Sequence, residues 1–376
     1  MLRTVLLTGK LYIVASYGEP MVRAETETSH IHNISFLSVE KPEGMLIRGD
    51  VPSRLHFGFI DTDEKGFLAG SAGMAIDFPR MLFTVSHPTD SSEIIPDATA
   101  TADPDTGEEF LSLLRKAFSH PTIKNRMADG GATIQPHVRP GVHFKTAIPR
   151  HVGLGSGTQM ALSAGKVASI LSDVDVPIDD LARFFGRGKR SRIGIEVFRG
   201  GGFIIHSAGK ECVKRYTVPD EWRFVVTIPD VKEHVYGHKE EGLLGCVRPL
   251  TEDERENLID GREDMVRGVL GRDIEAFGAG LQAVDTVTGR AFSAAQGGTY
   301  SYRVVEKGVE FALKNGSYGS GQSSWGPGFF SVTPDEETAE RLAEAMKHFV
   351  RAHGGGHVFI ARPRNHGAIF EVEENL

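Results

Sequence analysis

The chain has 376 residues, which is enough for two domains, and its 40% of hydrophobic residues is typical of a globular protein. The formal net charge of −8 argues against nucleic-acid binding through a basic face. Cys212 and Cys246 are too few for a disulfide framework, and no apolar run reaches the length of a membrane span. We therefore expect a cytoplasmic protein that binds neither nucleic acid nor a membrane.

Residues 1–46 are a weakly patterned N-terminal segment, which forms either a short hairpin or an extension; the sequence does not decide between them. Farther on, Leu55 and Phe57 alternate with Arg54 and His56, which predicts a half-buried strand with Arg54 and His56 on one face. These two polar side chains are either solvated or directed at a ligand. A second strand is expected over 74–78, a loop over 91–105, an amphipathic helix over 108–118 and a strand over 138–148.

A glycine-rich loop follows that last strand and leads into a helix, because apolar residues recur at helical spacing from Met160 to Leu171. The unpaired N–H groups and the positive dipole end at the start of such a helix form an anion site, usually for phosphate. A tight turn without a ligand is the alternative. If the anion site is real, its contacts come from Gly153, Gly155, Ser156, Gly157 and Thr158.

A second candidate anion site is a basic segment flanked by glycines. Arg187, Lys189, Arg190 and Arg192 fall within six residues of a net-acidic chain. Clustered guanidinium and ammonium groups favour phosphate binding, with Ser191 as a supporting donor, whereas a solvated basic turn is the alternative. We expect a short helix before this segment, over 181–185, and an apolar strand pair directly after it.

A new apolar strand pattern begins near residue 220, and we interpret it as the start of a second domain. Its expected elements are strands over 222–229, 357–361 and 368–372, and helices over 251–290, with breaks at Gly271 and Gly289, and over 334–353. A glycine- and serine-rich loop over 316–330 carries Gln322, Ser323, Ser324 and Trp325. This order of elements predicts two α+β domains, 47–219 and 220–376, rather than one doubly wound sheet.

Four segments together resemble one enzyme family. GLGSG at Gly153, preceded by Pro149, resembles the signature of the GHMP kinase superfamily. With SRLHFGFID at Ser53, GRGKRSRIGIEVFRGGGFI at Gly186 and GQSSWGP at Gly321, the chain from about residue 51 onward resembles β-ribofuranosylaminobenzene 5′-phosphate synthase. The resemblance implies a GHMP kinase-like two-domain fold, with an N-terminal glycine-loop domain and a C-terminal ferredoxin-like α+β domain.

The resemblance also implies an activity. That family condenses 5-phosphoribosyl 1-pyrophosphate with 4-aminobenzoate or 4-hydroxybenzoate, and releases carbon dioxide and pyrophosphate, in methanopterin biosynthesis. Magnesium, with ligands that the sequence does not identify, and a homodimer are implied as well. A GHMP kinase that uses ATP and magnesium on a small molecule is one alternative, and a phosphate-sensing protein without catalysis is another.

The implied site residues follow from the matching motifs. The expected catalytic residues are Arg54, His56 and Glu196, and the expected substrate contacts are the two anion segments and residues Gln322, Ser323, Ser324 and Trp325. Trp325 is a stacking surface for the aromatic substrate or a core residue that fixes its loop. Two positions depart from the patterns: Arg192 replaces a glycine usual in the synthase family, and Gly194 replaces the aspartate of the kinases.

Overall fold

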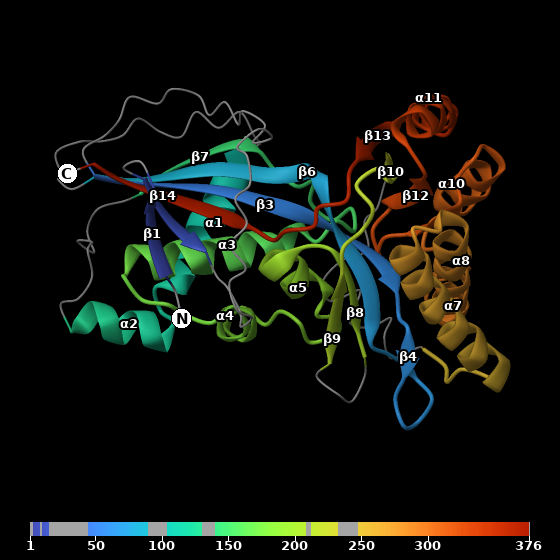
Figure 1. The fold of residues 1–376 in the computed structure, drawn as a ribbon, viewed down its shortest axis with the longest axis horizontal. Coiled ribbons are helices and arrows are strands. Elements are labelled where there is room, and N and C mark those ends of the chain that lie inside the picture. The colour runs from blue at the N-terminus through green and yellow to red at the C-terminus, as the bar shows by residue number, and fades with distance from the viewer. Residues whose placement is uncertain are drawn as a thin grey trace.

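A large antiparallel sheet dominates one half of the computed structural model (Figure 1), which describes residues 3–7, 10–14, 44–88, 104–129, 140–207, 212–231 and 247–375. The strand order is β1-β2-β14-β3-β6-β8-β9, and β7 also pairs with β6. The strands are β1 (Arg3–Leu7), β2 (Lys10–Val14), β3 (Gly44–Gly58), β6 (Ser71–Pro88), β7 (Gly141–Thr146), β8 (Phe203–His206), β9 (Val213–Tyr216) and β14 (Ile369–Asn375).

The long strands β3 and β6 run through the middle of this sheet and reach into the other half of the molecule (Figure 1). They pair antiparallel, with irregularities between Val51 and Ser53 and between His56 and Gly58. Bulges of this kind are common beside functional sites because they redirect a side chain. Leu55 and Phe57 are buried as predicted, but His56 is buried as well, so the strand is not half-buried at this point.

Helices cover one face of the first sheet (Figure 1): α1 (Pro104–Ala117), α2 (Pro121–Ala128), α3 (Ser156–Leu171), α4 (Ile178–Phe184) and α5 (Ile193–Gly200). The central helix is α3, which contacts α1, α4, α5 and β3. It is buried on almost all sides rather than on one face, because small residues let its neighbours approach closely. A Cβ at Gly165, for example, would lie 2.9 Å from Leu181 Cδ2.

A second, four-stranded antiparallel sheet has the order β11-β12-β10-β13. Its strands are β10 (Arg223–Pro229), β11 (Gly319–Gln322), β12 (Phe329–Thr333) and β13 (Gly356–Ala361). The helices of this half are α7 (Glu252–Gly271), α8 (Ile274–Ala291), α9 (Ser293–Gln296), α10 (Arg303–Lys314) and α11 (Glu336–Ala352). A two-stranded hairpin, β4 (Asp61–Thr62) with β5 (Leu68–Ala69), connects β3 to β6.

The prediction of a strand directly after the basic segment is wrong, because residues Ile193–Gly200 form helix α5 and strand β8 begins only at Phe203. Alternating apolar residues suggested a strand, yet Ile193 and Val197 lie four residues apart and pack together on one side of α5. Gly201 ends the helix with a φ of 63°. Glu196 is therefore a helical residue.

Most of the other expected elements are confirmed, with these differences. α1 begins at Pro104, inside the loop expected over 91–105, of which residues 91–103 lie outside the described residues, and β6 extends well beyond 74–78. The loop expected over 316–330 contains strand β11 and the start of β12. Gly289 does not break α8; a Cβ there would lie 2.4 Å from Thr299 O, so this glycine permits close packing. The last strand, β14, joins the first sheet beside β3, and β1 and β2 join it from the N-terminal extension.

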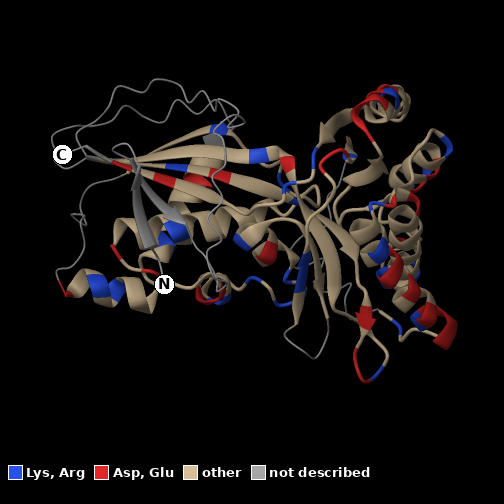
Figure 2. Cartoon of the chain, viewed as in Figure 1, with Lys and Arg blue, Asp and Glu red and all other residues tan. Residues whose placement is uncertain are grey.

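None of the helices in the described ranges combines the length and the apolar character that crossing a membrane requires. Figure 2 shows acidic and basic residues interspersed along the outer helix α7.

Candidate active site

A cavity of about 570 Å³ lies where the two halves of the molecule meet. One side is formed by β3, the glycine loop and the basic segment, and the other by α8 and residues 296–326. Of the residues predicted to form the site, those that line the cavity are Arg54, His56, Gly153, Gly155, Ser156, Gly157, Thr158, Arg187, Lys189, Arg190, Ser191, Gln322, Ser324 and Trp325.

The glycine loop presents the start of α3 to this cavity. Gly155 is the N-cap residue, with a φ of 80°. The N–H groups of Ser156 and Gly157 have no hydrogen-bond partner in the described part of the chain. The dipole of α3 adds positive potential at the same point. The loop therefore has the geometry of an anion site.

Gly153 and Gly157 lie in different surroundings, and the structure requires glycine only at the first of these positions. Gly153 has a φ of 89°, and a Cβ on it would lie 1.9 Å from Ser323 O, so only glycine lets the two loops approach. Gly157 lies inside α3 with no positive φ, so the left-handed conformation that a loop position would require is not needed there.

The basic segment folds over the start of α3. A Cβ on Gly157 would lie 3.5 Å from Arg187 Nη1, which places this guanidinium beside the unpaired N–H groups. Desolvation lowers the pKa of Arg187, although the residue as a whole is exposed. Lys189 and Arg190 are exposed and line the cavity as well. The segment thus adds positive charge to the anion site.

His56 is a buried, neutral histidine. Burial lowers its pKa to about 3. Gly58 N–H donates to His56 Nδ1 at 3.2 Å, so the proton is on Nε2, which donates to Ser191 Oγ at 3.2 Å. Ser191 Oγ also accepts a bond from Ile193 N–H at 3.3 Å and lies 2.9 Å from Ser71 Oγ. These hydrogen bonds connect the basic segment to the first sheet, and the Ser191 hydroxyl takes part in each bond to the segment.

The serine-rich loop closes the opposite side of the cavity. Gln322 Nε2 donates to Ser324 O at 2.8 Å and to Gly326 O at 3.2 Å, so this amide shapes its own loop. Trp325 is half-buried and packs edge-on against Phe292, with ring centroids 4.8 Å apart. Its ring borders the cavity and also fixes the loop, so it has features of both predicted alternatives.

Ser323 is a buried connector rather than a lining residue. Its Oγ accepts a bond from His56 N–H at 3.1 Å and donates to Gly153 O at 2.8 Å. It thereby holds β3, the glycine loop and the serine-rich loop together.

The comparisons with known proteins agree with this geometry. A family model described as "GHMP kinases C terminal" matches residues 265–352. Three archaeal proteins named β-ribofuranosylphenol 5′-phosphate synthase are similar in sequence. The one from Methanothermobacter thermautotrophicus is 28% identical over 85% of this chain and 97% of its own length. The one from Methanocaldococcus jannaschii is 31% identical over 54% of this chain and 66% of its own length. The one from Archaeoglobus fulgidus is 26% identical over 87% of this chain and 100% of its own length.

Solved structures share the fold at low sequence identity. Homoserine kinase from Cytophaga hutchinsonii has a TM-score of 0.61 at 16% identity, over 89% of this chain and 99% of its own. Galactokinase from Lactococcus lactis has a TM-score of 0.62 at 12% identity, over 86% of this chain and 94% of its own. The chain therefore has the GHMP kinase-like fold. Both the predicted fold and the predicted resemblance to the synthases are thereby confirmed.

At position 194, where the kinase pattern considered in the sequence analysis has an aspartate, this chain has a glycine and thus no carboxylate. Gly194 O accepts a bond from Gln159 Nε2 at 2.8 Å. A Cβ on Gly194 would lie 3.2 Å from Thr158 Cγ2, so the space for a side chain is small. Glu196 does not replace the missing acid, since it is not among the residues that line the cavity.

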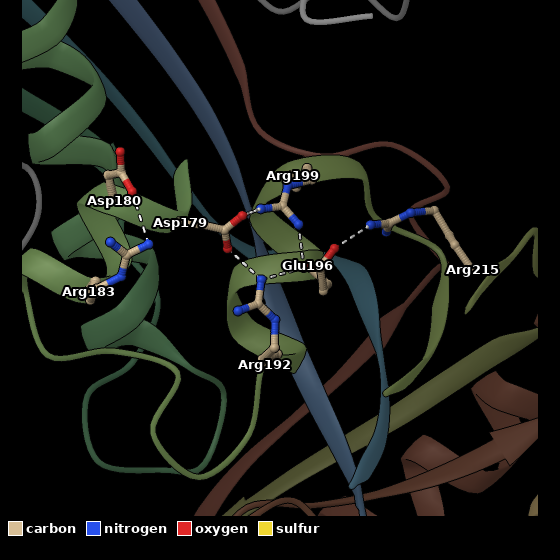
Figure 3. Close-up of polar contacts among 7 residues, drawn as sticks. All are labelled: Asp179, Asp180, Arg183, Arg192, Glu196, Arg199 and Arg215. Atoms are coloured by element: carbon tan, nitrogen blue, oxygen red, sulfur yellow. Dashed lines mark hydrogen bonds and ion pairs between the residues drawn. The ribbon is translucent and has the colours of Figure 1, made fainter. Parts of the chain in front are cut away.

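Glu196 instead lies in a cluster of ion pairs behind the basic segment (Figure 3). Its carboxylate is 2% exposed and contacts Arg192 at 3.4 Å, Arg215 at 3.1 Å, and Arg199. Arg192 and Arg199 also bind Asp179 of α4. The prediction that Glu196 is directed at the substrate therefore disagrees with the structure. Arg192 is turned away from the cavity in the same way.

Several lining residues were not predicted from the sequence: Phe59, Glu109, Arg150, Asp285, Thr288, Phe292 and Tyr300. Among these residues, Asp285 could have been identified from the sequence. It lies next to Val284 and one turn from Leu281, on the apolar stripe of α8, where a charged residue is unexpected. Its carboxylate is 6% exposed, and burial raises its pKa to about 7.

Proposed function

We propose that this protein condenses 5-phosphoribosyl 1-pyrophosphate with a 4-substituted benzoate and releases carbon dioxide and pyrophosphate. The observation that carries this proposal is the anion cradle at the start of α3, where unpaired N–H groups meet Arg187 at the cavity. The similarity to three enzymes named for a ribofuranosylphenol phosphate product supports a 4-hydroxybenzoate substrate.

The chemistry requires anion binding more than a strong nucleophile. As pyrophosphate leaves the ribose C1, it takes the electron pair of the C–O bond, and N–H donors and cations stabilise the departing charge. The ring carbon that carries the carboxylate attacks C1, activated by the para substituent. Loss of carbon dioxide returns the C–C bonding pair to the ring. Arg54, which lines the cavity beside the glycine loop, and Arg187 would bind the phosphates.

Magnesium is part of the proposal, and Glu109 is the residue that we propose to hold it. Within the described ranges, no group of three or more His, Cys, Asp or Glu could hold a metal by itself. Mg²⁺ is usually held by one or two carboxylates together with substrate phosphates. Glu109, which lines the cavity and pairs with Arg150 at 2.8 Å, would hold the ion together with pyrophosphate oxygens. The ion would neutralise charge on the leaving group.

We also propose, from the same resemblance, that the enzyme is a cytoplasmic homodimer that acts in methanopterin biosynthesis. A GHMP kinase activity is the alternative, and the absence of an acid at Gly194 speaks against it.

Product analysis tests the proposal. The protein is incubated with phosphoribosyl pyrophosphate, magnesium and either 4-hydroxybenzoate or 4-aminobenzoate, and products are identified by mass spectrometry. We expect a ribofuranosyl-arene 5′-phosphate, and one carbon dioxide and one pyrophosphate for each product. A parallel incubation with labelled ATP and candidate alcohols tests the kinase. Transfer of the label, with no arene product from either benzoate, would overturn the proposal.

A further inference from the structure

Positive charge lines only one side of the cavity. The described lining residues that carry it all come from the first half of the chain: Arg54, Arg150, Arg187, Lys189 and Arg190. The lining contributed by residues 285–326 contains no lysine or arginine, and its one carboxylate is Asp285. A ligand that spans the cavity therefore meets cations at one end and a carboxylate at the other.

Asp285 has unused capacity to accept hydrogen bonds. Its Oδ1 accepts from Gln322 N–H at 3.1 Å, and its Oδ2 accepts from Tyr300 O–H at 2.5 Å. A carboxylate offers about four lone-pair positions, so two remain. No ion pair to Asp285 is found among the described residues, and burial alone raises its pKa. A buried carboxylate without a cation, at a cavity wall, suits a ligand that donates a hydrogen bond.

Aromatic rings line the cavity next to Asp285. Phe292 lies two turns along α8 from Asp285, on the same face of the helix. Its ring contacts Trp325 at 4.8 Å and Phe59 at 5.8 Å between centroids. Thr288, between Asp285 and Phe292, accepts a bond from Phe59 N–H at 3.1 Å and so fixes these rings to β3. These rings provide an apolar wall for a flat ligand.

We propose that Asp285 accepts a hydrogen bond from the para substituent of the benzoate. The ring then lies along Phe292 and Trp325, and the benzoate carboxylate points to the cations across the cavity. This inference rests on the proposed function. It adds a subsite that recognises the hydrogen-bond donor of the aromatic substrate, and it explains why a single acidic group faces the cationic side.

The arrangement also accounts for the proton during the reaction. As the ring attacks ribose C1, positive charge develops on the para oxygen, and its proton passes to Asp285. The C1–O bond to pyrophosphate breaks, and the new C–C bond forms. When carbon dioxide leaves, its bonding electrons return to the ring and Asp285 returns the proton to the oxygen. No other reactant is consumed, and Asp285 ends as a carboxylate.

Equilibrium binding to wild-type protein and to Asp285→Asn tests the subsite. The ligands are 4-hydroxybenzoate, 4-methoxybenzoate, which has no donor, and benzoate, in the presence of magnesium and pyrophosphate. A hydrogen bond to a charged group is worth about tenfold to a hundredfold in affinity. We expect wild type to prefer 4-hydroxybenzoate over the other two by this factor. Asp285→Asn keeps an acceptor oxygen but loses the negative charge, so its preference should fall to the few-fold effect of a neutral hydrogen bond, with unchanged affinity for phosphoribosyl pyrophosphate.

A control variant accompanies the measurement. Asp260→Asn makes the same change on the exposed side of α7 and should keep the preference. Circular dichroism checks that Asp285→Asn is folded; if it is not, the wild-type comparison of hydroxy and methoxy ligands decides alone.

The outcomes separate this inference from the proposed function. If wild type forms the arene product but binds the hydroxy and methoxy ligands equally, or if folded Asp285→Asn keeps the preference, the subsite is wrong and the activity stands. If wild type forms no product from any benzoate, the proposed function fails, and the subsite fails with it.

Discussion

Arg187 lies beside Gly157 at the start of α3, so its removal should weaken binding of the phosphoribosyl donor more than binding of the aromatic acid. A charge-assisted hydrogen bond is worth about 1.5–3 kcal/mol. We expect Arg187→Ala to raise the dissociation constant of phosphoribosyl pyrophosphate about tenfold to a hundredfold, with little change for 4-hydroxybenzoate. Isothermal titration calorimetry measures both constants.

The matched control is Arg192→Ala. Arg192 is part of the same basic segment, but it is paired with Asp179 and Glu196 and does not line the cavity. Its removal should leave donor affinity within about twofold, a change of less than 0.5 kcal/mol by the usual conversion. If Arg187→Ala keeps wild-type affinity for phosphoribosyl pyrophosphate, as we expect of Arg192→Ala, the basic segment is a solvated turn.

His56 should make the fold sensitive to acid. Its folded pKa, about 3, lies below the usual 6.5 because the ring is buried. Below pH 6.5 the unfolded chain binds a proton that the folded chain does not, so stability is lost as the pH falls from 6.5 towards 3. The loss is about 1.4 kcal/mol for each pH unit. Urea unfolding at pH 7 and pH 5 should show that His56→Gln loses less stability than wild type does.

The exposed His357 provides the control, since His357→Gln should keep the wild-type dependence on pH. Equal slopes in His56→Gln and wild type would mean that His56 is charged in the folded protein.

At the scale of elements, the contact between the glycine loop and the serine-rich loop depends on Gly153. A Cβ there would lie 1.9 Å from Ser323 O, and the positive φ adds strain. We expect Gly153→Ala to cost about 1–3 kcal/mol of stability, measured by urea unfolding, and to lower turnover. Gly157→Ala adds the same atom inside α3 at ordinary contact distance, and should not reduce stability. Equal losses in the two variants would contradict this account of the loop.

Helix α5 depends on Glu196, which holds three arginines from α5, its N-cap and β9. Glu196→Gln leaves their charges facing one another without the central carboxylate, and should cost about 3 kcal/mol. Affinity for phosphoribosyl pyrophosphate should remain, because Glu196 does not line the cavity. Glu252→Gln, which breaks an exposed pair with Arg255, should cost less than about 1 kcal/mol. Lost donor affinity in stable Glu196→Gln would restore the predicted role at the substrate.

At the scale of the whole molecule, Arg364 connects the C-terminal segment to the first sheet. It is 3% exposed, and its guanidinium donates to Asp50 Oδ1 at 2.6 Å and to Gly367 O at 3.0 Å. Its backbone N–H donates to Ala75 O at 3.0 Å. These bonds lead the chain from the second sheet to strand β14, which pairs with β3.

We therefore expect Arg364→Met to cost about 3–5 kcal/mol, because the carboxylate of Asp50 stays buried without its closest partner. Urea unfolding measures the loss. Asp50→Asn combined with Arg364→Met should be more stable than Arg364→Met alone, since no buried charge is left without a partner. A double variant as unstable as the single one would mean that Arg364 acts mainly through packing.

The sequence alone predicted the features that depend on neighbours along the chain. The glycine loop, the basic segment and most helices, such as 334–353, are local patterns, because capping, amphipathic spacing and the conformational freedom of glycine act within a few residues. These patterns sufficed to predict the GHMP kinase-like fold and about half of the residues that line the cavity.

Only the tertiary structure decided what depends on distant contacts. Residues 193–200 became α5, and Glu196 turned from the cavity, because β6, β9 and α4 lie against that segment. β14 joined the first sheet because Arg364 and Asp50 meet across 314 positions of sequence. Asp285 became a cavity residue through Tyr300 and Gln322, which approach it only when α8 packs against β11. Burial and charge at a site are sums over such contacts, and periodicity within one element does not contain them.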